Sequence, residues 1–417
     1  MRDFEHTFNV LSRVIEEGLS FNLAINSEIK KEKRADPSLK NVISASSGSV
    51  LRHYYLFKEI ITRQYGEIKE SKFILLAMGL ANRLFSKRFE EETLLRFIEK
   101  ESELDDVKSF IETFTNEKSL IPEDITLGSK KYLSLRYNLP LWVVDMWEKN
   151  AGDLFKKRLF PSIYKSQNLF ARVNTRELTR EQFLEKYSGF EPLFDDYFVK
   201  YCEKGNIRKH ESIINGDAFN YSPCYSLLLA DLDVDPYRGI AFYSACNNQL
   251  LYELAMRLGT GFKADYLCRN QQHFFEANKA VKQLGLTDIS LYECSEDAIL
   301  TCISKPVHTF FVCPNNSSFL NLKDKPDYFL RIKQEDLDSF IHDEYSALIN
   351  ASAHVEDGGY LIYFIPTFCK NESKGVIRKF LKVAPSFKLE KEIQLFPFDK
   401  YQTLFYFAVL KKEVSND

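Results

Sequence analysis

The sequence contains few residues that interrupt regular structure, with 13 prolines and 16 glycines among its 417 residues. This scarcity excludes long flexible linkers of low complexity. No segment approaches the roughly 18 uninterrupted apolar residues of a membrane-spanning helix. The opening residues, MRDFEHTFNVL, also lack the basic and apolar regions of a secretory signal peptide. From these absences we expect a cytoplasmic protein that does not enter a membrane.

Cysteine is also scarce, and its placement excludes two common uses. All eight cysteines lie at or after Cys202, and no two of them form a C-x-x-C pair. His273, His308 and His342 have no partner at the spacing of metal ligands. The sequence therefore predicts no zinc site and no disulfide framework, and scattered free thiols are typical of a reducing cytoplasm.

An excess of positive charge is missing as well. The formal net charge is −3, whereas dedicated RNA-binding domains are usually basic because they neutralise phosphates. Any RNA contact must therefore come from a local patch. The hydrophobic content of 45% and the charged content of 28% are those of a globular protein. The length predicts two or three domains.

The first 150 residues read as helices. Segments 71–85 and 49–66 place apolar residues at helical spacing, and Gly66 stands where a helix would end. A further helix is expected over 140–166, with Pro140 in a first-turn position. We therefore predict an all-α domain over residues 1–150.

The pattern changes after residue 150. Residues 169–175 alternate like a strand, Thr179 suits a helix N-cap, and residues 197–202 form a second candidate strand. These features predict a small α+β domain over residues 151–215.

From Gly216 to the end, apolar strands alternate with amphipathic helices. This alternation predicts a mostly parallel sheet covered on both faces, with an antiparallel edge at the end of the chain, as in a Rossmann-like class I methyltransferase. The strands are expected within residues 239–246, 262–268, 289–294, 308–314, 358–366, 387–396 and 403–412.

Several segments resemble the RsmB/Fmu (Sun/NOP) family of RNA cytosine-C5 methyltransferases. The stretch KYLSLRYNLPLWVVDMWEKNAG (131–152) is similar to the family's "RYSHPEWLV" and the helix after it. LFARVNT (169–175) resembles its "LRVNT" strand, and NKAVKQLGL (278–286) resembles "NLKRLGL". DGGYLIYFIPTFCKNES (357–373) is similar to "GGTLVYATCSLLPEEN". The resemblance runs over about residues 40–412.

This resemblance implies a multidomain protein that acts on RNA. Residues 1–150 would be a NusB-like RNA-binding domain, residues 151–215 an RRM-like linker domain, and residues 216–417 the Rossmann-like domain that uses S-adenosylmethionine. The substrate would be a cytosine in ribosomal RNA, swung out of its stack, and the protein would act as a monomer. The RNA contacts implied at matching positions are Arg136, Arg172 and Asn174.

The cofactor motif departs from the family. FYSACNNQLL (242–251) stands where the family has the Gly-rich "DLCAAPGGKT", which lets the cofactor lie on the backbone. The motif positions implied in cofactor binding are Ser244, Ala245, Cys246, Asn247, Asn248 and Gln249. At the end of the next strand, Cys268 replaces the acid that holds the ribose hydroxyls, and Asp265 lies three residues too early. These changes indicate an altered cofactor pocket.

The catalytic motifs depart from the family too. The family's nucleophilic cysteine, which attacks carbon-6 of cytosine, is replaced by Pro366, which has no nucleophilic atom. Asn315 replaces the cysteine that assists product release, while the neighbouring Pro314 is retained. Cys369 and Cys313 lie two or three residues away and are possible substitutes only if the chain brings their sulfur atoms back to the site.

We interpret these four substitutions together as the mark of an impaired enzyme that still binds RNA or a ribosome-assembly partner. In that case it has no cofactor. One alternative is an active S-adenosylmethionine-dependent RNA methyltransferase with a divergent site. Another is a protein-interaction scaffold without an RNA role. The structural question that separates the first two is whether Cys369 or Cys313 reaches the cofactor cleft.

Overall fold

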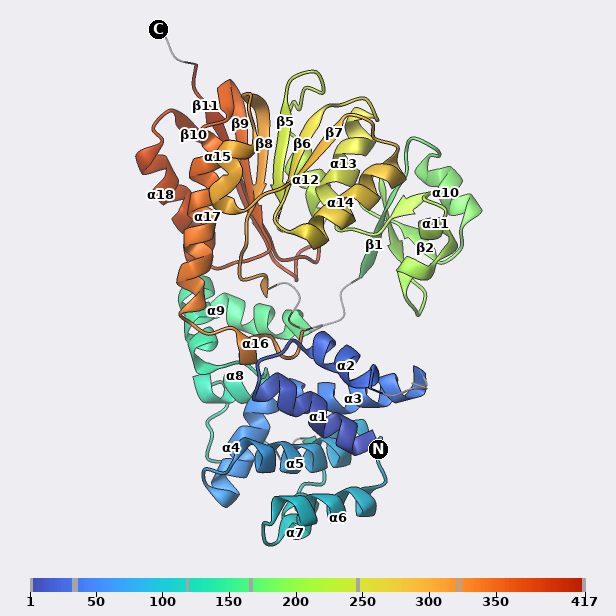
Figure 1. Cartoon of the computed structure of the whole chain (residues 1–417), viewed down its shortest axis with the longest axis vertical. Helices are drawn as coiled ribbons and strands as arrows, with labels where there is room; N and C mark the ends of the chain where they lie inside the picture. Colours follow the sequence, from blue (N-terminus) through green and yellow to red (C-terminus); the bar gives the residue numbers. More distant parts are fainter. Residues whose placement is uncertain are drawn as a thin grey trace. The chain divides into compact units, whose positions relative to one another are not determined.

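The computed structural model describes residues 3–31, 37–117, 120–164, 168–244, 248–319, 322 and 325–414, and for residues 151, 153–156, 163 and 164 it describes the backbone alone. The chain forms two compact units (Figure 1). The first comprises Met1–Lys156 and Asn321–Asp336, and the second comprises Lys157–Leu320 and Leu337–Asp417. Within the described residues, no helix is long and apolar enough to cross a membrane.

The first unit is helical, as the apolar spacing predicts. Its elements are α1 (Asp3–Ile15), α2 (Phe21–Ile29), α3 (Pro37–Arg52), α4 (Tyr54–Tyr65), α5 (Glu70–Ala81), the π-helical turn η1 (Asn82–Ser86), α6 (Glu91–Ser102), α7 (Val107–Glu112), α8 (Lys130–Arg136), the first part of α9 (Leu141–Tyr164) and α16 (Tyr328–Arg331). Helix α5 lies in the core, because every residue from Phe73 to Ala81 is buried. The apolar spacing predicted one buried face for this helix, whereas the structure buries all of its faces from Phe73 to Ala81.

Two helices predicted as continuous contain a break. The segment 49–66 is divided between α3 and α4 at His53, whose backbone leaves the helical region at φ −125° and ψ 19°. The His53 ring stacks on Phe85, with the ring centroids 3.8 Å apart. Helix α9 is kinked at Gly152, where φ is +66°, a conformation that glycine adopts without strain. Tertiary packing and a single glycine therefore override the local helical pattern.

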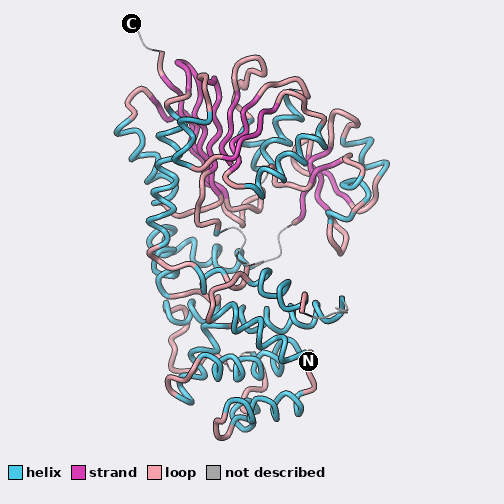
Figure 2. Tube along the Cα trace, in the orientation of Figure 1, coloured by secondary structure: helices cyan, strands magenta, loops and turns pink. Residues whose placement is uncertain are grey.

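The second unit is built on a seven-stranded sheet (Figure 2). Its strands are β5 (Ile240–Ser244), β6 (Ala264–Cys268), β7 (Ile289–Glu293), β8 (Val307–Cys313), β9 (Val355–Ile365), β10 (Phe387–Leu395) and β11 (Phe405–Lys412). The order is β10-β11-β9-β8-β5-β6-β7. Strands β5 to β9 are parallel, and β11 runs antiparallel to both of its neighbours. The predicted parallel sheet with an antiparallel edge is confirmed.

Helices cover both faces of this sheet (Figure 1). They are α12 (Cys224–Leu229), α13 (Gln249–Leu258), α14 (Gln271–Leu284), α15 (Ile299–Cys302), α17 (Asp336–Ser352) and α18 (Val376–Val383). Side chains from α12, α13 and α14 form one apolar core with the sheet, and side chains from α15, α17 and α18 form another. The strands read as continuous apolar runs because both faces are covered.

A second, four-stranded sheet belongs to the same unit. Its order is β2-β3-β1-β4, and it carries the short helices α10 (Arg180–Lys186) and α11 (Glu211–Ile214). The strands are β1 (Leu169–Val173), β2 (Phe190–Pro192), β3 (Phe198–Tyr201) and β4 (Ala218–Phe219). Thr179 caps α10 with the predicted side-chain bond. Because β4 lies beyond residue 215, this sheet is completed by residues after the expected end of the α+β segment.

A buried ion pair fixes the small sheet to the α/β layers. Arg172 of β1 donates from Nε to the Glu253 carboxylate of α13 at 3.2 Å, and the two side chains are 2% and 0% exposed. Tyr221 and Arg257 donate to the same carboxylate, each at 2.8 Å. Because the four side chains leave few of the polar atoms unpaired, the two sheets of this unit are held in one arrangement.

Candidate active site

Four parallel strands end side by side in the second unit. Ser244 at the end of β5 is in register with Cys268 of β6 on one side and Cys313 of β8 on the other. Strand β9 ends next to β8. In open α/β sheets, ligands bind beyond the carboxyl ends of such strands, where the strand order reverses. The described positions among those assigned to the cofactor and to catalysis therefore lie at this edge or in the loops that leave it.

The loop after β5 is described only at its two ends. Ser244 is buried, and Ala245, Cys246 and Asn247 lie outside the described residues. Asn248 precedes α13 with an ordinary backbone conformation (φ −76°, ψ 14°), and its side chain accepts a hydrogen bond from the Tyr266 hydroxyl at 2.7 Å. Gln249 is the first residue of α13. Asn248 is thus tied to β6.

No carboxylate stands at the end of β6. Cys268 is fully buried, and burial raises the pKa of its thiol to about 12, so it is neutral at physiological pH. Asp265 is three residues earlier, about 10 Å along the strand, and its side chain points to the other face of the sheet. Asn270 caps α14 by accepting from the backbone of His273 at 3.0 Å. The ribose-binding acid therefore has no substitute among these residues.

A chain of polar side chains crosses the edge of the sheet at this point. Arg269 follows β6, and its Nη1 donates to the Asn315 side-chain oxygen at 2.8 Å. The Arg269 Nε lies 3.2 Å from the Glu296 carboxylate, and Asn315 donates to Asp343 at 3.1 Å. Since Asn315 follows β8 and β5 lies between β8 and β6, the bond from Arg269 to Asn315 passes over the end of β5. This bond therefore lies at the carboxyl edge of the sheet, the edge at which ligands of such sheets bind.

The loop after β9 has no available nucleophile at the expected place. Pro366 is half-buried and the Thr367 hydroxyl lies 3.1 Å from a Glu372 carboxylate oxygen. Cys369 is buried, and burial together with the nearby Glu372 raises the pKa of its thiol to about 12. A thiol with so high a pKa is a poor nucleophile at neutral pH, because the thiolate is the reactive form.

The second candidate cysteine, Cys313, is also unavailable as a nucleophile. Cys313 is buried at the end of β8 and is disulfide-bonded, so it has no free thiol. The expectation of free cysteines throughout the chain is therefore wrong at this residue, because residue spacing does not reveal which cysteines form a disulfide. Pro314 follows directly and leads into the loop that carries Asn315. In the described part of the chain, no group of histidine, cysteine and acidic residues could hold a metal ion.

Two buried carboxyl groups form a feature that the sequence analysis missed. Glu372 accepts from the backbone and hydroxyl of Ser317, both at 2.7 Å, and so ties the loop after β8 to the loop after β9. Glu344 of α17 lies beside it, and burial and Glu372 raise its pKa well above the usual value. Burial also raises the pKa of Glu372. The burial of Glu344 could have been recognised from the sequence, because Glu344 lies on the same helical face of α17 as the apolar Ala347, Leu348 and Ala351.

Each of the residues predicted to contact RNA has a partner within its own unit. Arg136 is exposed on the helical unit and forms an ion pair with Glu117 at 3.0 Å. Arg172 is buried in the ion pair with Glu253. Asn174 donates from its side chain to the Gly216 carbonyl at 3.0 Å and holds the end of β1 against residues before β4. Arg136 thus belongs to the first unit, and Arg172 and Asn174 belong to the second, where each forms a contact within the fold.

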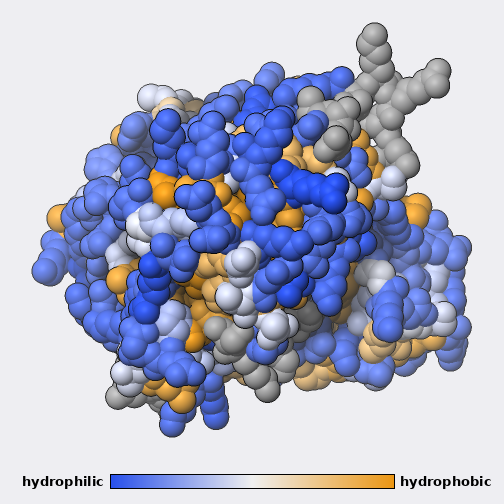
Figure 3. Space-filling model, turned by 90° about the horizontal axis from the view of Figure 1, so that it is seen from below, coloured by the Kyte–Doolittle hydropathy of each residue, from blue (hydrophilic) through white to orange (hydrophobic). Residues whose placement is uncertain are grey.

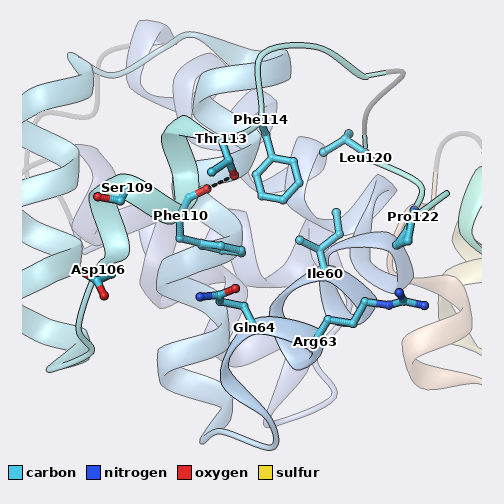
Figure 4. A pocket seen from close by; sticks show the side chains of 10 residues that line it. All are labelled: Ile60, Arg63, Gln64, Asp106, Ser109, Phe110, Thr113, Phe114, Leu120 and Pro122. Carbon is cyan, nitrogen blue, oxygen red and sulfur yellow. Dashed lines mark hydrogen bonds between the residues drawn. The ribbon is translucent and has the colours of Figure 1, made fainter. Parts of the chain in front are cut away.

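The helical unit has a hollow of its own, with a volume of about 510 Å³ (Figure 4). Figure 4 shows Phe110, Phe114 and Ile60 at its centre, and Arg63 at its rim. Arg63 forms a bidentate ion pair with Asp124.

Seen from below, the surface is mainly hydrophilic, with apolar residues in small groups (Figure 3).

Comparison with known proteins gives similarity in structure alone. The sequence matches none of the protein-family models and none of the curated proteins. The structure is similar to that of PH0851 over 99% of both chains, with a TM-score of 0.73 and 17% identity. A methyltransferase homologue from Pyrococcus horikoshii matches 69% of this chain and 100% of its own, with a TM-score of 0.58 and 15% identity. NSun6 from Pyrococcus horikoshii, with SFG, matches 65% and 97% at a TM-score of 0.58 and 11% identity.

At these identities the likeness establishes the fold. The second unit has a seven-stranded, mostly parallel sheet of the Rossmann-like methyltransferase type, and the likeness to PH0851 extends over the helical unit as well. The fold expected from the family resemblance is confirmed in this respect. Activity must be argued from the residues at the site, because one fold serves many functions.

Proposed function

We propose that the chain is a divergent member of the RsmB/Fmu (Sun/NOP) family that binds RNA but does not methylate cytosine by the family's two-cysteine route. The observation that carries this proposal is the hydrogen bond from Arg269 to Asn315 over the end of β5. In a class I methyltransferase, S-adenosylmethionine lies at this edge. The side chain that releases the product in the family is here replaced by an amide bonded to Arg269 and Asp343.

The chemistry of the remaining residues supports the loss of methyl transfer. The family reaction needs a thiolate that attacks carbon-6 of the base. Pro366 has no such group, Cys369 is a buried thiol with a raised pKa, and Cys313 is disulfide-bonded. The residues also fit the cofactor poorly, since neutral Cys268 replaces the acid for the ribose hydroxyls.

Binding of RNA is the part of the family function that the remaining scaffold supports. In this proposal, residues 1–150 are the NusB-like RNA-binding domain, residues 151–215 the RRM-like linker, and residues 216–417 the former catalytic domain. The partner is RNA of the ribosome or of its assembly, and the protein acts as a cytoplasmic monomer. Its net charge of −3 requires a local binding patch instead of a wholly basic surface.

A second candidate is an active S-adenosylmethionine-dependent RNA methyltransferase with a rearranged site. The similarity to NSun6 from Pyrococcus horikoshii, which holds SFG, favours this candidate. It requires Arg269 to leave Asn315 so that the cofactor can enter. The third candidate, a protein-interaction scaffold without RNA, requires that the chain bind no RNA at all.

Calorimetric titration with S-adenosylmethionine up to millimolar concentration tests the proposal. We expect no saturable heat from the wild type. Arg269→Ala removes the group that crosses the edge of the sheet and should gain measurable binding, whereas Arg378→Ala, at an exposed arginine of α18, should not. Micromolar binding by the wild type would contradict the proposal and support the active enzyme, in which case Cys369→Ala should abolish methyl transfer to RNA.

A further inference from the structure

A cleft of about 810 Å³ opens in the second unit, away from the catalytic positions. Its walls come from three parts of the fold that are distant in sequence: the small sheet, helices α12 and α13, and the segment between β10 and β11. The lining residues are Arg172, Thr175, Phe194, Asp195, Tyr197, Pro223, Ser226, Leu227, Ala230, Met256, Arg257, Lys400 and Tyr401. A volume of this size lies within the range of sites that hold small organic groups.

Aromatic side chains stand at the mouth of this cleft with much of their surface in water. Phe194 is 46% exposed and Tyr197 is 45% exposed. The Phe194 ring meets the ring of Tyr401 edge to face, with centroids 5.2 Å apart. Exposed aromatic rings at the rim of a hollow are suited to stacking with flat groups such as nucleobases.

Cationic groups lie beside these rings. The Lys400 ammonium is 4.5 Å from the centroid of Phe194 and 5.1 Å from that of Tyr401. Among the described residues, no carboxylate lies within ion-pair distance of Lys400. Arg257 is fixed on the wall by its bonds to Glu253 and to the Ser226 carbonyl, each at 2.8 Å. Lys400 is therefore the cation that remains available for a phosphate.

The charge balance of the cleft is positive in a chain that is negative overall. Arg172, Arg257 and Lys400 contribute three positive charges, while Glu253 behind the wall and Asp195 at the rim contribute two negative charges. The Asp195 carboxylate accepts from the backbone of Tyr197 at 3.0 Å and of Phe198 at 2.8 Å, which partly satisfies its charge. Arg172 lies 4.3 Å from the centroid of Tyr197 and supports that ring from the interior.

We propose that this cleft binds an unpaired stretch of RNA. A base stacks on Phe194 or Tyr197 at the rim, Lys400 contacts the adjoining phosphate, and Leu227 and Met256 provide an apolar wall. The inference rests on the proposed RNA-binding function and adds the place and the form of RNA. A duplex would not present its bases to these rings, because they are stacked inside the helix.

The test measures fluorescence anisotropy of a labelled single-stranded RNA, and of the same RNA annealed to its complement, with the full-length protein. We expect the wild type to prefer the single strand. Phe194→Ala should weaken single-strand binding about tenfold, the usual effect of losing one stacking partner. Lys400→Ala should weaken it and reduce the slope of log affinity against log salt by about 0.7, the loss of one phosphate contact.

Matched controls separate this effect from general damage. Tyr237→Ala removes an aromatic ring that is 94% exposed outside the cleft, and Lys305→Ala removes an exposed lysine elsewhere on the second unit. Both should bind like the wild type, and all variants should keep the wild-type melting temperature. RNA binding that Phe194→Ala and Lys400→Ala leave unchanged would overturn the cleft but not the proposed function. Equal binding of single strand and duplex would also overturn the inference, and a wild type that binds no RNA would overturn both.

Discussion

Single residues determine the chemistry left at the edge of the sheet, and the carboxyl pair Glu344 and Glu372 shows this best. Glu372 accepts hydrogen bonds from Ser317, in the loop after β8, and from Thr367, in the loop after β9, and so holds the two loops together. Glu344 has no hydrogen-bond donor of its own within the described structure. Its carboxyl group is therefore stable in the fold chiefly while it carries a proton, since an unpaired charge in the interior is costly.

A pH-dependent stability follows from Glu344. Its pKa is raised by burial and by Glu372, so the folded chain holds a proton that the unfolded chain loses above about pH 4.3. The free energy of unfolding therefore falls as the pH rises from that value towards the raised pKa. Glu344→Gln cannot ionise, and we expect its advantage over the wild type in free energy of unfolding to grow between pH 5 and pH 8, reaching roughly 1–3 kcal/mol.

Scanning calorimetry at several pH values measures this difference. Glu335→Gln provides the control, because Glu335 is exposed just before the same helix and its replacement should change the melting temperature little at any pH. A Glu344→Gln variant whose stability relative to the wild type does not vary with pH would show that Glu344 is not held in its protonated form.

At the scale of elements, strand β1 and helix α13 are joined through one buried charge. The Glu253 carboxylate accepts hydrogen bonds from Arg172 of the strand, from Tyr221 in the segment after β4, and from Arg257 of its own helix. Its removal leaves Arg172 buried without a counter-charge. Arg172 and Arg257, which this carboxylate holds, line the cleft that carries Phe194 and Lys400, so the cleft depends on Glu253 for its shape.

Glu253→Ala should therefore lower the free energy of unfolding by about 3–5 kcal/mol, the usual effect of breaking a buried ion pair from one side. Urea denaturation followed by circular dichroism measures the change. Glu191→Ala is the matched control, because it breaks an exposed pair with Lys200 in the same small sheet and should cost less than about 1 kcal/mol. Equal effects of the two variants would mean that the buried pair does not hold the sheets together.

At the scale of the whole molecule, the chain returns to the helical unit after it has formed most of the α/β sheet. After β8 the chain leaves the α/β unit, and Asn321–Asp336 packs as part of the helical unit before α17 begins. Asp327 is buried there and accepts from the backbone of Phe21 at 3.1 Å and from Arg331 at 2.7 Å. The helical unit is thus completed by residues from the second half of the sequence.

We expect Asp327→Ala to loosen the helical unit, although residue 327 lies beyond the first strands of the α/β sheet. Removing the acceptor leaves the Phe21 N–H without its partner and should raise hydrogen exchange at the start of α2 about tenfold, corresponding to a loss of roughly 1–2 kcal/mol. Exchange in β5 and β8 should stay as in the wild type. Asp105→Ala, at an exposed position of the same unit, should have no such effect, and equal exchange in α2 of both variants would contradict the prediction.

The sequence allowed much of the fold to be predicted, because hydrophobic periodicity is a local property. Every strand expected after Gly216 is present, and Thr179 caps its helix as predicted. The breaks at His53 and Gly152 were not predicted, since the stacking of His53 on Phe85 is a tertiary contact and the positive φ of Gly152 is not visible in the apolar spacing. The positions of the helices and strands could thus be predicted from the sequence, whereas the breaks within the helices could not.

The sequence by itself determined which chemical groups stand at the motif positions, including Pro366 in place of a nucleophile and Cys268 in place of an acid. Only the tertiary structure decided where the groups outside the motifs meet. Arg269 reaches Asn315 across β5, which the sheet order places between their strands, and Phe194 meets Tyr401 where the small sheet is fixed to α13. Local pattern arises from the regular spacing of side chains along one helix or strand, whereas such contacts depend on how distant strands are ordered in space.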